Sequence, residues 1–384
     1  MNILMLPSWY MTQDNPLNGI FFREQAHALY SQGVNVFVIS LNVYSIRNLS
    51  KFLRLKNKKN IYTDNGIITY SISYLNIFPR IKILYLLYSA LILRKHFRLF
   101  SKQYKIKVDL VHIHSALDLG LIYYLSKIRV KFILTEHSTL YSRNLLTFCD
   151  KKLLPKVFSS ADYLVAVGNG LKNEMEKYTK KDINVIFNLV SLENYPLEID
   201  KCKNKFRFFS IGDPLYKKGF DVLISAFSKT NMLDSTELII AGLSDPNEIT
   251  KLQEMIRQYD LKNVKVFGQI SRQDVANFMY NCDCFVLPSR FETFGVVFAE
   301  AMLFGKPVIA TITGGPDSFV IQETGLLVHV DDIYETANAL EYIYINRKKY
   351  NKKFIAKYAL DNFSSKIICE KIINIYENIL KNEK

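Results

Sequence analysis

The sequence has few cysteines and no apolar run long enough to cross a bilayer. Its five cysteines are scattered among 384 residues, so they give neither a disulfide framework nor a paired zinc-binding spacing. A spanning helix needs about 20 apolar residues, and the most apolar stretch, 81–93, contains Lys82. The first residues, MNILMLPSW, lack the basic stretch and apolar core of a signal peptide. We therefore expect a reduced protein in the cytoplasm.

The bulk composition is that of an ordinary globular protein. With 49% hydrophobic and 22% charged residues, a disordered or fibrous chain is excluded. No internal repeat or low-complexity tract is present, which excludes solenoid and propeller architectures. At roughly 100–200 residues per domain, the length indicates two domains.

The positive charge is concentrated in one part of the chain. The formal net charge is +14, and residues 1–200 carry 26 Lys and Arg against 14 Asp and Glu. Within this half, residues 51–107 hold 13 basic residues and a single acid, Asp64. Such a density attracts an anionic partner, which could be a phospholipid surface, a nucleic acid or a phosphorylated substrate.

Short apolar runs alternate with amphipathic stretches of helix length along the whole chain. Apolar strands separated by helices are typical of parallel sheets covered on both faces. The pattern starts again after residue 205, which predicts an α/β fold of two doubly wound, Rossmann-like parallel-sheet domains with a cleft between them. We expect domains at 1–195 and 205–365, a linker within 191–204, and a C-terminal helix at 366–384 that packs back on the first domain.

The apolar helix predicted over Ile81–Leu93 is followed at once by basic residues. An apolar helix with basic and aromatic flanks suits a position at a membrane surface, where the long side chains reach the headgroups. The alternative is a buried helix with a solvated basic end, because periodicity alone does not separate the two. The residues of this predicted membrane or acceptor patch are Arg94, Lys95, Arg98 and Lys102.

Two carboxylates bracket a predicted helix start in the second half of the chain. Glu292 lies in a loop after the strand at 284–287, and a helix opens near Gly295 and carries Glu300. A strand that feeds a helix N-terminus presents free amide groups that can bind phosphate, and glycine permits close approach. On an apolar helix face, Glu300 needs a hydroxyl or cationic partner, such as a ribose diol. The alternative is a pair of structural acids.

This constellation, within SRFETFGVVFAEAMLFGKPVIAT and followed by TGGPDSFV and TGLLV, resembles the retaining glycosyltransferases of family four. The E-x7-E spacing, the strand and the glycines match together, and the resemblance implies the GT-B fold. In that family the first Glu contacts the donor sugar, the second the ribose, and the amides after the first Glu the diphosphate. The resemblance assigns these roles to Glu292, to Glu300, and to the backbone of Phe294, Gly295 and Val296.

A second match is SIGDPLYKKGFDVL, which resembles the family's loop that neutralises the donor diphosphate. Lys218 occupies the lysine position, while Asp213 stands where the family has arginine. Lys217, next to Lys218 in the sequence, is the candidate substitute for the missing cation. The alternative for the two lysines is a solvated turn. The first loop, PSWYMTQDNPLNG, is similar to the family's glycine-containing loop, so Gly19 is expected near the transferred phosphate or the acceptor, and a plain turn is the alternative.

Histidines follow two predicted strands of the first domain. His112 and His114 share one strand face at its carboxyl end, where open sheets bind ligands. No third metal ligand is near them in the sequence, so we expect no metal site. His137, in LTEHST, matches the family's histidine that approaches the sugar. The alternative is a buried structural histidine.

The resemblance thus implies a glycosyltransferase, of hexosyltransferase type, that moves a sugar with retention from a UDP- or GDP-linked donor. We expect no cofactor, a glycan or polyprenyl-linked acceptor, an anionic membrane surface as partner, and a peripheral location on the inner face of the plasma membrane. Bacterial surface polysaccharide assembly is the expected pathway. The alternatives are a nucleotide-sugar epimerase of the same fold and a non-catalytic basic protein that binds membrane or nucleic acid. The sugar, nucleotide, acceptor and oligomeric state are not determined by the sequence.

Overall fold

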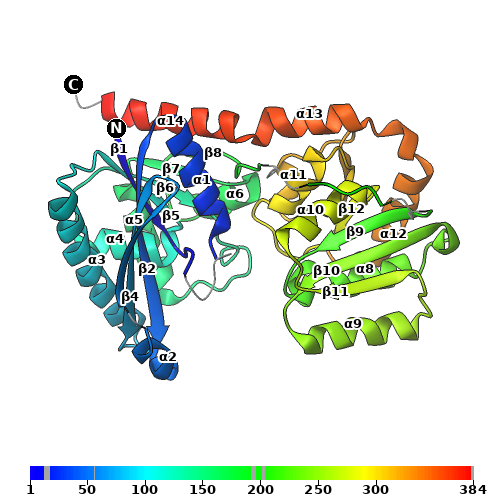
Figure 1. Ribbon diagram of the computed structural model, residues 1–384, viewed down its shortest axis with the longest axis horizontal. Coiled ribbons are helices and arrows are strands. Elements are labelled where there is room, and N and C mark those ends of the chain that lie inside the picture. The colour runs from blue at the N-terminus through cyan, green and yellow to red at the C-terminus, as the bar shows by residue number, and fades with distance from the viewer. Residues whose placement is uncertain (13–17, 56, 192–195, 201–203, 382–384) are drawn as a thin grey trace. The chain divides into compact units, whose positions relative to one another are not determined.

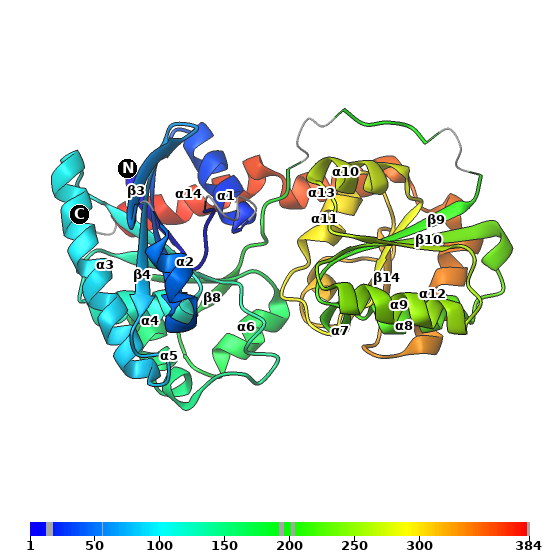
Figure 2. The ribbon, with the colours of Figure 1, turned by 60° about the horizontal axis from the view of Figure 1, so that its bottom comes forward.

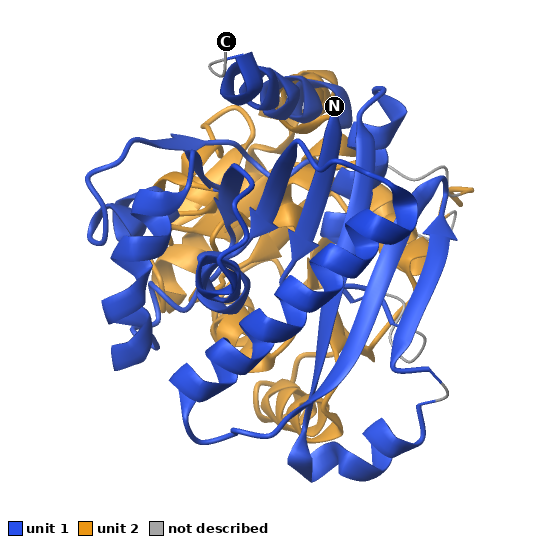
Figure 3. Cartoon of the chain, turned by 90° about the vertical axis from the view of Figure 1, so that its left-hand side faces the viewer, with its two compact units in different colours: residues 1–167, 171–189, 365–384 blue, residues 168–170, 190–364 orange. Residues whose placement is uncertain are grey.

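The computed structural model describes residues 1–12, 18–55, 57–191, 196–200 and 204–381. It divides into two compact units (Figure 3). Unit 1 comprises Met1–Val167, Leu171–Leu189 and Ser365–Lys384, and unit 2 comprises Gly168–Gly170 and Val190–Ser364. The units divide directly before the predicted linker 191–204, of which residues 192–195 and 201–203 lie outside the described part. Likewise, residues 13–17 of the predicted first loop are not described.

Unit 1 contains an eight-stranded sheet with the order β3-β4-β2-β1-β5-β6-β7-β8. Its strands are β1 (Asn2–Pro7), β2 (Asn35–Ser45), β3 (Lys59–Asp64), β4 (Ile67–Asn76), β5 (Leu110–His114), β6 (Phe132–Glu136), β7 (Tyr163–Ala166) and β8 (Ile183–Val185). Every neighbouring pair is parallel except β3 and β4, which are antiparallel. The sequence analysis did not predict this antiparallel edge strand. The hairpin turns at Asn65 and Gly66, both with positive φ, as a two-residue turn requires.

Helices cover both faces of this sheet (Figure 1). Their bounds are α1 (Ile20–Ser31), α2 (Leu49–Leu53), α3 (Lys82–Tyr104), α4 (Leu121–Ser126), α5 (Phe148–Ser160), α6 (Asn169–Glu176) and α14 (Ser365–Lys381). On β1, Ile3 and Met5 belong to the core cluster under α1 and α14, whereas Leu4 alternates with them and is equally buried. Burial on both faces explains why the strands are continuous apolar runs.

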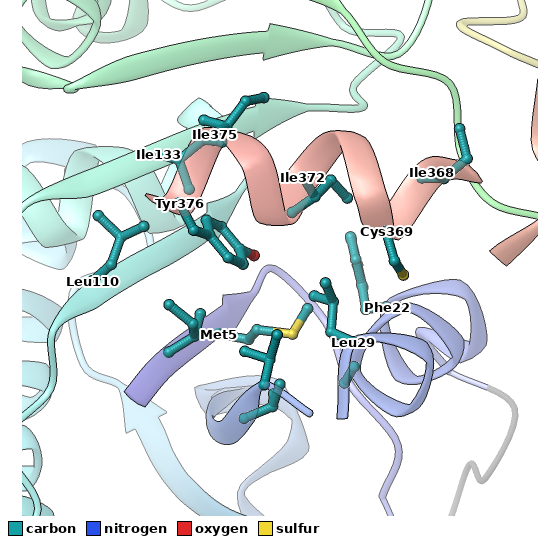
Figure 4. Close-up of a cluster of buried hydrophobic side chains, with 14 of the residues drawn as sticks. Met5, Phe22, Leu29, Leu110, Ile133, Ile368, Cys369, Ile372, Ile375 and Tyr376 are labelled. Carbon is teal, nitrogen blue, oxygen red and sulfur yellow. The ribbon is translucent and has the colours of Figure 1, made fainter. Parts of the chain in front are cut away.

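Helix α14 returns the end of the chain to unit 1. Its buried residues Ile368, Ile372, Ile375 and Tyr376 recur at helical spacing and join the core cluster of β1, β5, β6 and α1. Figure 4 shows the ring of Tyr376 directed from α14 toward Met5 of β1. Unit 1 is thus completed by the last residues of the sequence.

Helix α3 extends to Tyr104, well beyond the predicted end at residue 93. The basic residues predicted to flank the helix are therefore part of it. No helix of the described residues is both long and apolar enough to cross a membrane. The four cysteines within the described part of the chain are free.

Unit 2 contains a six-stranded parallel sheet with the order β11-β10-β9-β12-β13-β14. Its strands are β9 (Phe206–Ile211), β10 (Thr236–Leu243), β11 (Val264–Gly268), β12 (Cys284–Leu287), β13 (Val308–Thr311) and β14 (Gly325–Val328). Its helices are α7 (Leu215–Lys218), α8 (Phe220–Phe227), α9 (Pro246–Gln258), α10 (Arg272–Asn281), α11 (Val296–Leu303), α12 (Ile333–Ile345) and α13 (Lys352–Phe363). Figure 2 shows α8, α9 and α12 on one face and α10, α11 and α13 on the other. The doubly wound prediction is confirmed for both units.

Candidate active site

Lys218 and Glu292 meet at the switch point of the sheet in unit 2. The strand order reverses between β9 and β12, which is where open α/β sheets bind their ligands. Lys218 follows β9 and Glu292 follows β12, and Nζ of Lys218 lies 2.6 Å from Oε1 of Glu292. The Oγ of Ser289 also donates to Oε1, at 3.0 Å. The side chain of Glu292 is only 9% exposed, so its negative charge depends on these two donors.

Two glycines make this approach possible. A Cβ on Gly212 would lie 2.7 Å from Cγ of Lys218, so the stem of the lysine crosses the bare backbone of this glycine. Gly219 has φ +68°, and a Cβ there would lie 2.0 Å from the carbonyl oxygen of Pro288. Any larger residue would separate the two loops and withdraw the lysine from the carboxylate.

Arg290 holds the same two loops together, although the sequence analysis did not single it out. Its guanidinium binds both carboxylate oxygens of Asp221, at 2.8 and 2.9 Å, and lies 4.1 Å from the ring centroid of Tyr216. Its backbone N–H donates to the carbonyl of Lys217. Nothing local in the sequence signals this pairing, because Asp221 and Arg290 are far apart along the chain.

The proposed diphosphate loop opens α11. Gly295, at the N-cap, has φ +87°, a conformation that favours glycine. Phe294 is 1% exposed and packs on Phe319 and Phe363, so its side chain is held in the core of unit 2. A Cβ on Gly315 would lie 2.8 Å from the amide nitrogen of Phe294, which explains the second glycine of TGGPDSFV. The amides of Phe294, Gly295 and Val296 thus lie on a closely packed loop at a helix N-terminus.

Glu300 projects from the second turn of α11 and meets a cation that sequence analysis missed. NH1 of Arg272, the first residue of α10, lies 3.1 Å from Oε1 of Glu300. The Glu300 side chain is 9% exposed, whereas Arg272 is 30% exposed. The expected cationic partner of this carboxylate therefore exists within unit 2. A guanidinium that is planar and partly exposed can also hydrogen-bond a bound nucleotide.

Asp213, at the position where the family has arginine, accepts hydrogen bonds from a neighbouring loop of unit 2. The N–H and Oγ of Ser244 donate to its two carboxylate oxygens, at 3.2 and 2.9 Å. Asp213 thus joins the loops after β9 and β10. Lys217 and Lys218 both lie in the last turn of α7, and of the two Lys218 is the one that reaches Glu292.

In unit 1, Gly19 stands at the N-cap of α1 with φ +70°. A Cβ there would lie 2.4 Å from the carbonyl oxygen of Trp9, so this position requires glycine for close backbone packing after β1. The start of α1 thereby lies beside the carboxyl end of β1, at the switch point between β1 and β5.

Three histidines lie close together at the carboxyl ends of β5 and β6, with His137 directly after β6. The rings of His112 and His114 stack at 4.2 Å, and Nδ1 of His114 lies 3.1 Å from Nε2 of His137. Burial lowers the pKa of His112 and of His137 to about 3 and that of His114 well below its usual range. All three imidazoles are therefore neutral near pH 7. No group of three or more potential metal-binding side chains occurs among the described residues.

Glu136 anchors the loops around these histidines. Its buried carboxylate accepts hydrogen bonds from the N–H groups of Ala116, His137 and Ser138. It also accepts from Oγ of Ser115 and Oη of Tyr141, at 2.9 Å each. Five donors satisfy a buried charge fully, so the backbone of His137 is held in place.

The basic residues of the predicted membrane patch lie on α3. Lys95, Arg98 and Lys102 are exposed and Arg94 is half-buried. At the N-terminal end of the same face, Leu84, Leu87 and Leu91 are 38%, 43% and 67% exposed. The exposed face of α3 is therefore apolar in its first half and basic in its second.

Comparisons with known proteins concern the family and the fold of the chain. The family "Glycosyl transferases group 1" matches residues 193–359, and "Glycosyltransferase Family 4" matches residues 19–194. An uncharacterized glycosyltransferase of Methanocaldococcus jannaschii is 30% identical over 262 residues, which cover 64% of this chain and 71% of that protein. A putative teichuronic acid biosynthesis glycosyltransferase of Bacillus subtilis is 25% identical over 366 residues, 88% of each chain.

Among solved structures, Anabaena HepE in complex with UDP-glucose has a TM-score of 0.70 at 18% identity, covering 98% of this chain and 100% of that chain. This similarity shows the fold, which is the GT-B fold of two parallel-sheet α/β domains. The two family models and the relative that is 30% identical show that the chain belongs to the family 4 glycosyltransferases.

Proposed function

We propose that the protein transfers a sugar, with retention, from a nucleotide-diphosphate sugar to a glycan or lipid-linked acceptor. The observation that carries this proposal is the meeting of Lys218 and Glu292 beside the N-terminus of α11, at the switch point of unit 2. The arrangement supplies a cation, a carboxylate and the backbone of a helix N-terminus in one region of unit 2. The UDP-glucose bound by the related HepE structure supports a nucleotide-sugar donor.

The donor is bound along unit 2. The diphosphate lies at the amides of Phe294, Gly295 and Val296, where the helix dipole and Lys218 offset its charge. Glu300 accepts from the ribose hydroxyls, which suits a carboxylate that is buried and held in place by Arg272.

The reaction develops positive charge on the anomeric carbon and negative charge on the leaving diphosphate. Lys218 and the loop amides stabilise the leaving group, and the leaving phosphate accepts the proton of the acceptor hydroxyl. Glu292 and His137 position the sugar and stabilise its charge. No covalent sugar intermediate and no metal ion are part of the proposal.

The acceptor belongs to bacterial surface polysaccharide synthesis, as the name of the Bacillus relative suggests. A polyprenyl-linked acceptor would reside in a membrane. The exposed face of α3, with Leu84, Leu87 and Leu91 followed by Lys95, Arg98 and Lys102, fits an anionic bilayer because leucines enter the interface while cations meet lipid phosphates. The proposed location is the inner face of the plasma membrane.

A screen against UDP- and GDP-sugars tests the function. Binding of one donor should raise the melting temperature, because a ligand at 100 times its dissociation constant stabilises by about 2.7 kcal/mol. The same donor should then label a membrane or glycan extract with its sugar. Release of an isomerised nucleotide sugar without acceptor would indicate an epimerase, and no turnover of any nucleotide sugar would refute the proposal.

A further inference from the structure

Three connections of unit 1 leave the sheet at the same edge. The strands β2, β4 and β6 belong to its parallel run, so their carboxyl ends lie at one edge, together with Gly19 and His137. The connection after β2 enters α2, the one after β4 enters α3, and the one after β6 enters α5. Figure 1 shows α2 directly beyond the end of β2. The edge that carries the predicted acceptor residues is therefore also the edge of these three connections.

Large apolar side chains are exposed on all three connections. Phe148, the first residue of α5, is 82% exposed, and Leu53, the last residue of α2, is 65% exposed. With them, the following exposed residues form what we call the apolar rim: Leu49 of α2, Ile81, Leu84 and Leu87 at the start of α3, and Leu145 before α5. At the opposite, amino edge, the exposed large apolar side chains that the structure describes are Met1, Tyr30 and Leu99. A gathering of apolar side chains at one edge is typical of a surface that contacts a partner or a membrane.

The backbone of Phe148 is fixed, so its exposure does not come from a loose chain. Thr147 caps α5, because its Oγ1 accepts from the N–H of Asp150 while Oδ2 of Asp150 accepts from the N–H of Thr147 at 2.9 Å. The other carboxylate oxygen of Asp150 lies 2.6 Å from Nζ of Lys82, the first residue of α3. The starts of α3 and α5 are thus joined, and their exposed side chains belong to one surface.

The charge of the same stretches is positive. Residues 46–54, 77–87 and 143–152 contain eight Lys and Arg and a single acid, Asp150. Asp150 is 2% exposed and is paired with Lys82, and Asp118, in the connection after β5, lies 3.9 Å from the same lysine. Cations among apolar side chains match an anionic bilayer, because the apolar groups enter the interface while the cations meet lipid phosphates. A nucleic acid would need the cations alone.

We propose that the membrane-binding surface of unit 1 continues from the first half of α3 around the carboxyl edge of the sheet, and that Phe148 and Leu53 insert between the lipid headgroups. This inference rests on the lipid-linked acceptor of the proposed function and deepens it, because it states which edge of unit 1 meets the bilayer. The phosphate of a polyprenyl-linked acceptor lies at the membrane surface. An acceptor held there faces the edge that carries Gly19 and His137.

A single tryptophan at position 148 tests the insertion. Trp9→Phe removes the one tryptophan of the sequence, and Phe148→Trp then places the reporter where an aromatic ring is already exposed. On addition of phosphatidylcholine–phosphatidylglycerol vesicles, its emission should shift to shorter wavelength, and brominated acyl chains should quench it. Ile345→Trp in the same background is the control, since Ile345 is 69% exposed on unit 2, and its emission should stay unchanged. Unshifted emission from the Phe148→Trp variant after it has sedimented with these vesicles would overturn the proposal.

Serine variants test the contribution of the apolar rim to binding. Leu53→Ser and Phe148→Ser should each weaken binding to the same vesicles about tenfold, because each loses an inserted side chain. Ile345→Ser resembles Leu53→Ser in size and exposure and should bind as the wild type does. Wild-type binding by both rim variants would overturn the proposal. A shift of the Phe148→Trp emission that needs only a higher protein concentration, without lipid, would assign the rim to a contact between two copies and would overturn it as well.

The vesicle experiments separate this inference from the proposed function. If the Phe148→Trp variant inserts but the wild-type protein turns over no nucleotide sugar, the docking edge stands and the function fails. If sugar transfer is observed while the reporter at position 148 remains in water on vesicle-bound protein, the function stands and the docking edge is wrong.

Discussion

Nζ of Lys218 lies 2.6 Å from Oε1 of Glu292, although the two residues are 74 positions apart. The contact joins the loops that follow β9 and β12, and Arg290 joins the same loops through Asp221. Two ion pairs thus connect the loop that carries Lys218 with the loop that carries Glu292. A ligand that approaches either residue meets both.

Replacing Lys218 should cost more activity than replacing its neighbour. Lys218→Ala leaves Glu292 without its cation, and a hydrogen bond to a charged group contributes about 1.5–3 kcal/mol, so donor affinity should fall by about one to two orders of magnitude. Lys217→Ala removes the adjacent cation of the same turn and should change affinity far less. Calorimetric titration with the donor nucleotide measures both, and the reverse order would place the phosphate contact at Lys217.

Glu300 should recognise the ribose, and this is testable with the ligand itself. Glu300→Gln should weaken binding of the ribonucleotide about tenfold and leave the affinity for the 2′-deoxynucleotide much less affected. Arg272→Met removes the cation that lies 3.1 Å from Glu300 and serves as a second variant. If Glu300→Gln weakens both nucleotides equally, the carboxylate acts through Arg272 or through folding and does not contact the ribose.

Much of this site could be predicted from the sequence because it is local. The carboxylates are eight residues apart around one helix start, and strand, glycine and helix signals surround them in a single stretch. The partners of those residues could not be predicted in this way. Arg272 and Glu300, or Asp213 and Ser244, meet only after folding, and neither side chain carries a local signal for its partner.

The β3–β4 hairpin at the edge of the unit 1 sheet was not predicted, although the sequence carries a local signal for it. Asn65-Gly66 is a hairpin signal, and β4 alternates polar and apolar residues. Residues 51–107 combine this hairpin with a high positive charge, and the charge alone indicated a surface patch. The contact of Tyr376 with His112 spans 264 positions, so only the tertiary structure could reveal it.

Activity should survive a chelator. Lys218 and the amides at the start of α11 offset the charge of the leaving diphosphate, the task that a divalent cation performs in other transferases. Initial rates with and without excess EDTA should therefore agree within a factor of about two. Complete loss with EDTA, restored by magnesium or manganese, would contradict this prediction.

The stability of unit 1 should fall in mild acid. Native His112 and His137 have pKa values lowered to about 3, against 6.5 for an ordinary histidine. Between these values the unfolded chain binds protons that the native state does not, so the free energy of unfolding decreases as pH falls from 6.5 toward 3. The expected slope is up to about 1.4 kcal/mol per pH unit for each histidine.

Urea unfolding followed by fluorescence of Trp9, the one tryptophan of the sequence, reports on unit 1. His112→Gln should show a shallower dependence on pH between 7 and 5 than the wild type. His329→Gln changes an exposed histidine of unit 2 and is the control. Parallel pH curves for the wild type and His112→Gln would show that His112 is not kept neutral by the fold.

The exposed face of α3 should bind anionic membranes. Each Lys or Arg near such a surface contributes about 1 kcal/mol, so replacing Arg94, Lys95, Arg98 and Lys102 by Ser should release the protein from anionic vesicles at moderate salt. Leu87→Ser with Leu91→Ser should weaken binding without a change in charge. Sedimentation with anionic and with neutral vesicles measures both effects, while nucleotide binding by unit 2 should persist.

A matched control separates this face from the overall positive charge. Unit 2 carries a second exposed basic cluster at Arg347, Lys348, Lys349 and Lys353, and its replacement by four serines lowers the net charge by the same amount. If α3 is the docking face, this control should still sediment with anionic vesicles. Equal release of both quadruple variants would mean that the charge acts non-specifically. Equal pelleting of the wild type with neutral vesicles would mean that the cations of α3 do not select the membrane, and that they are available for a soluble phosphorylated acceptor.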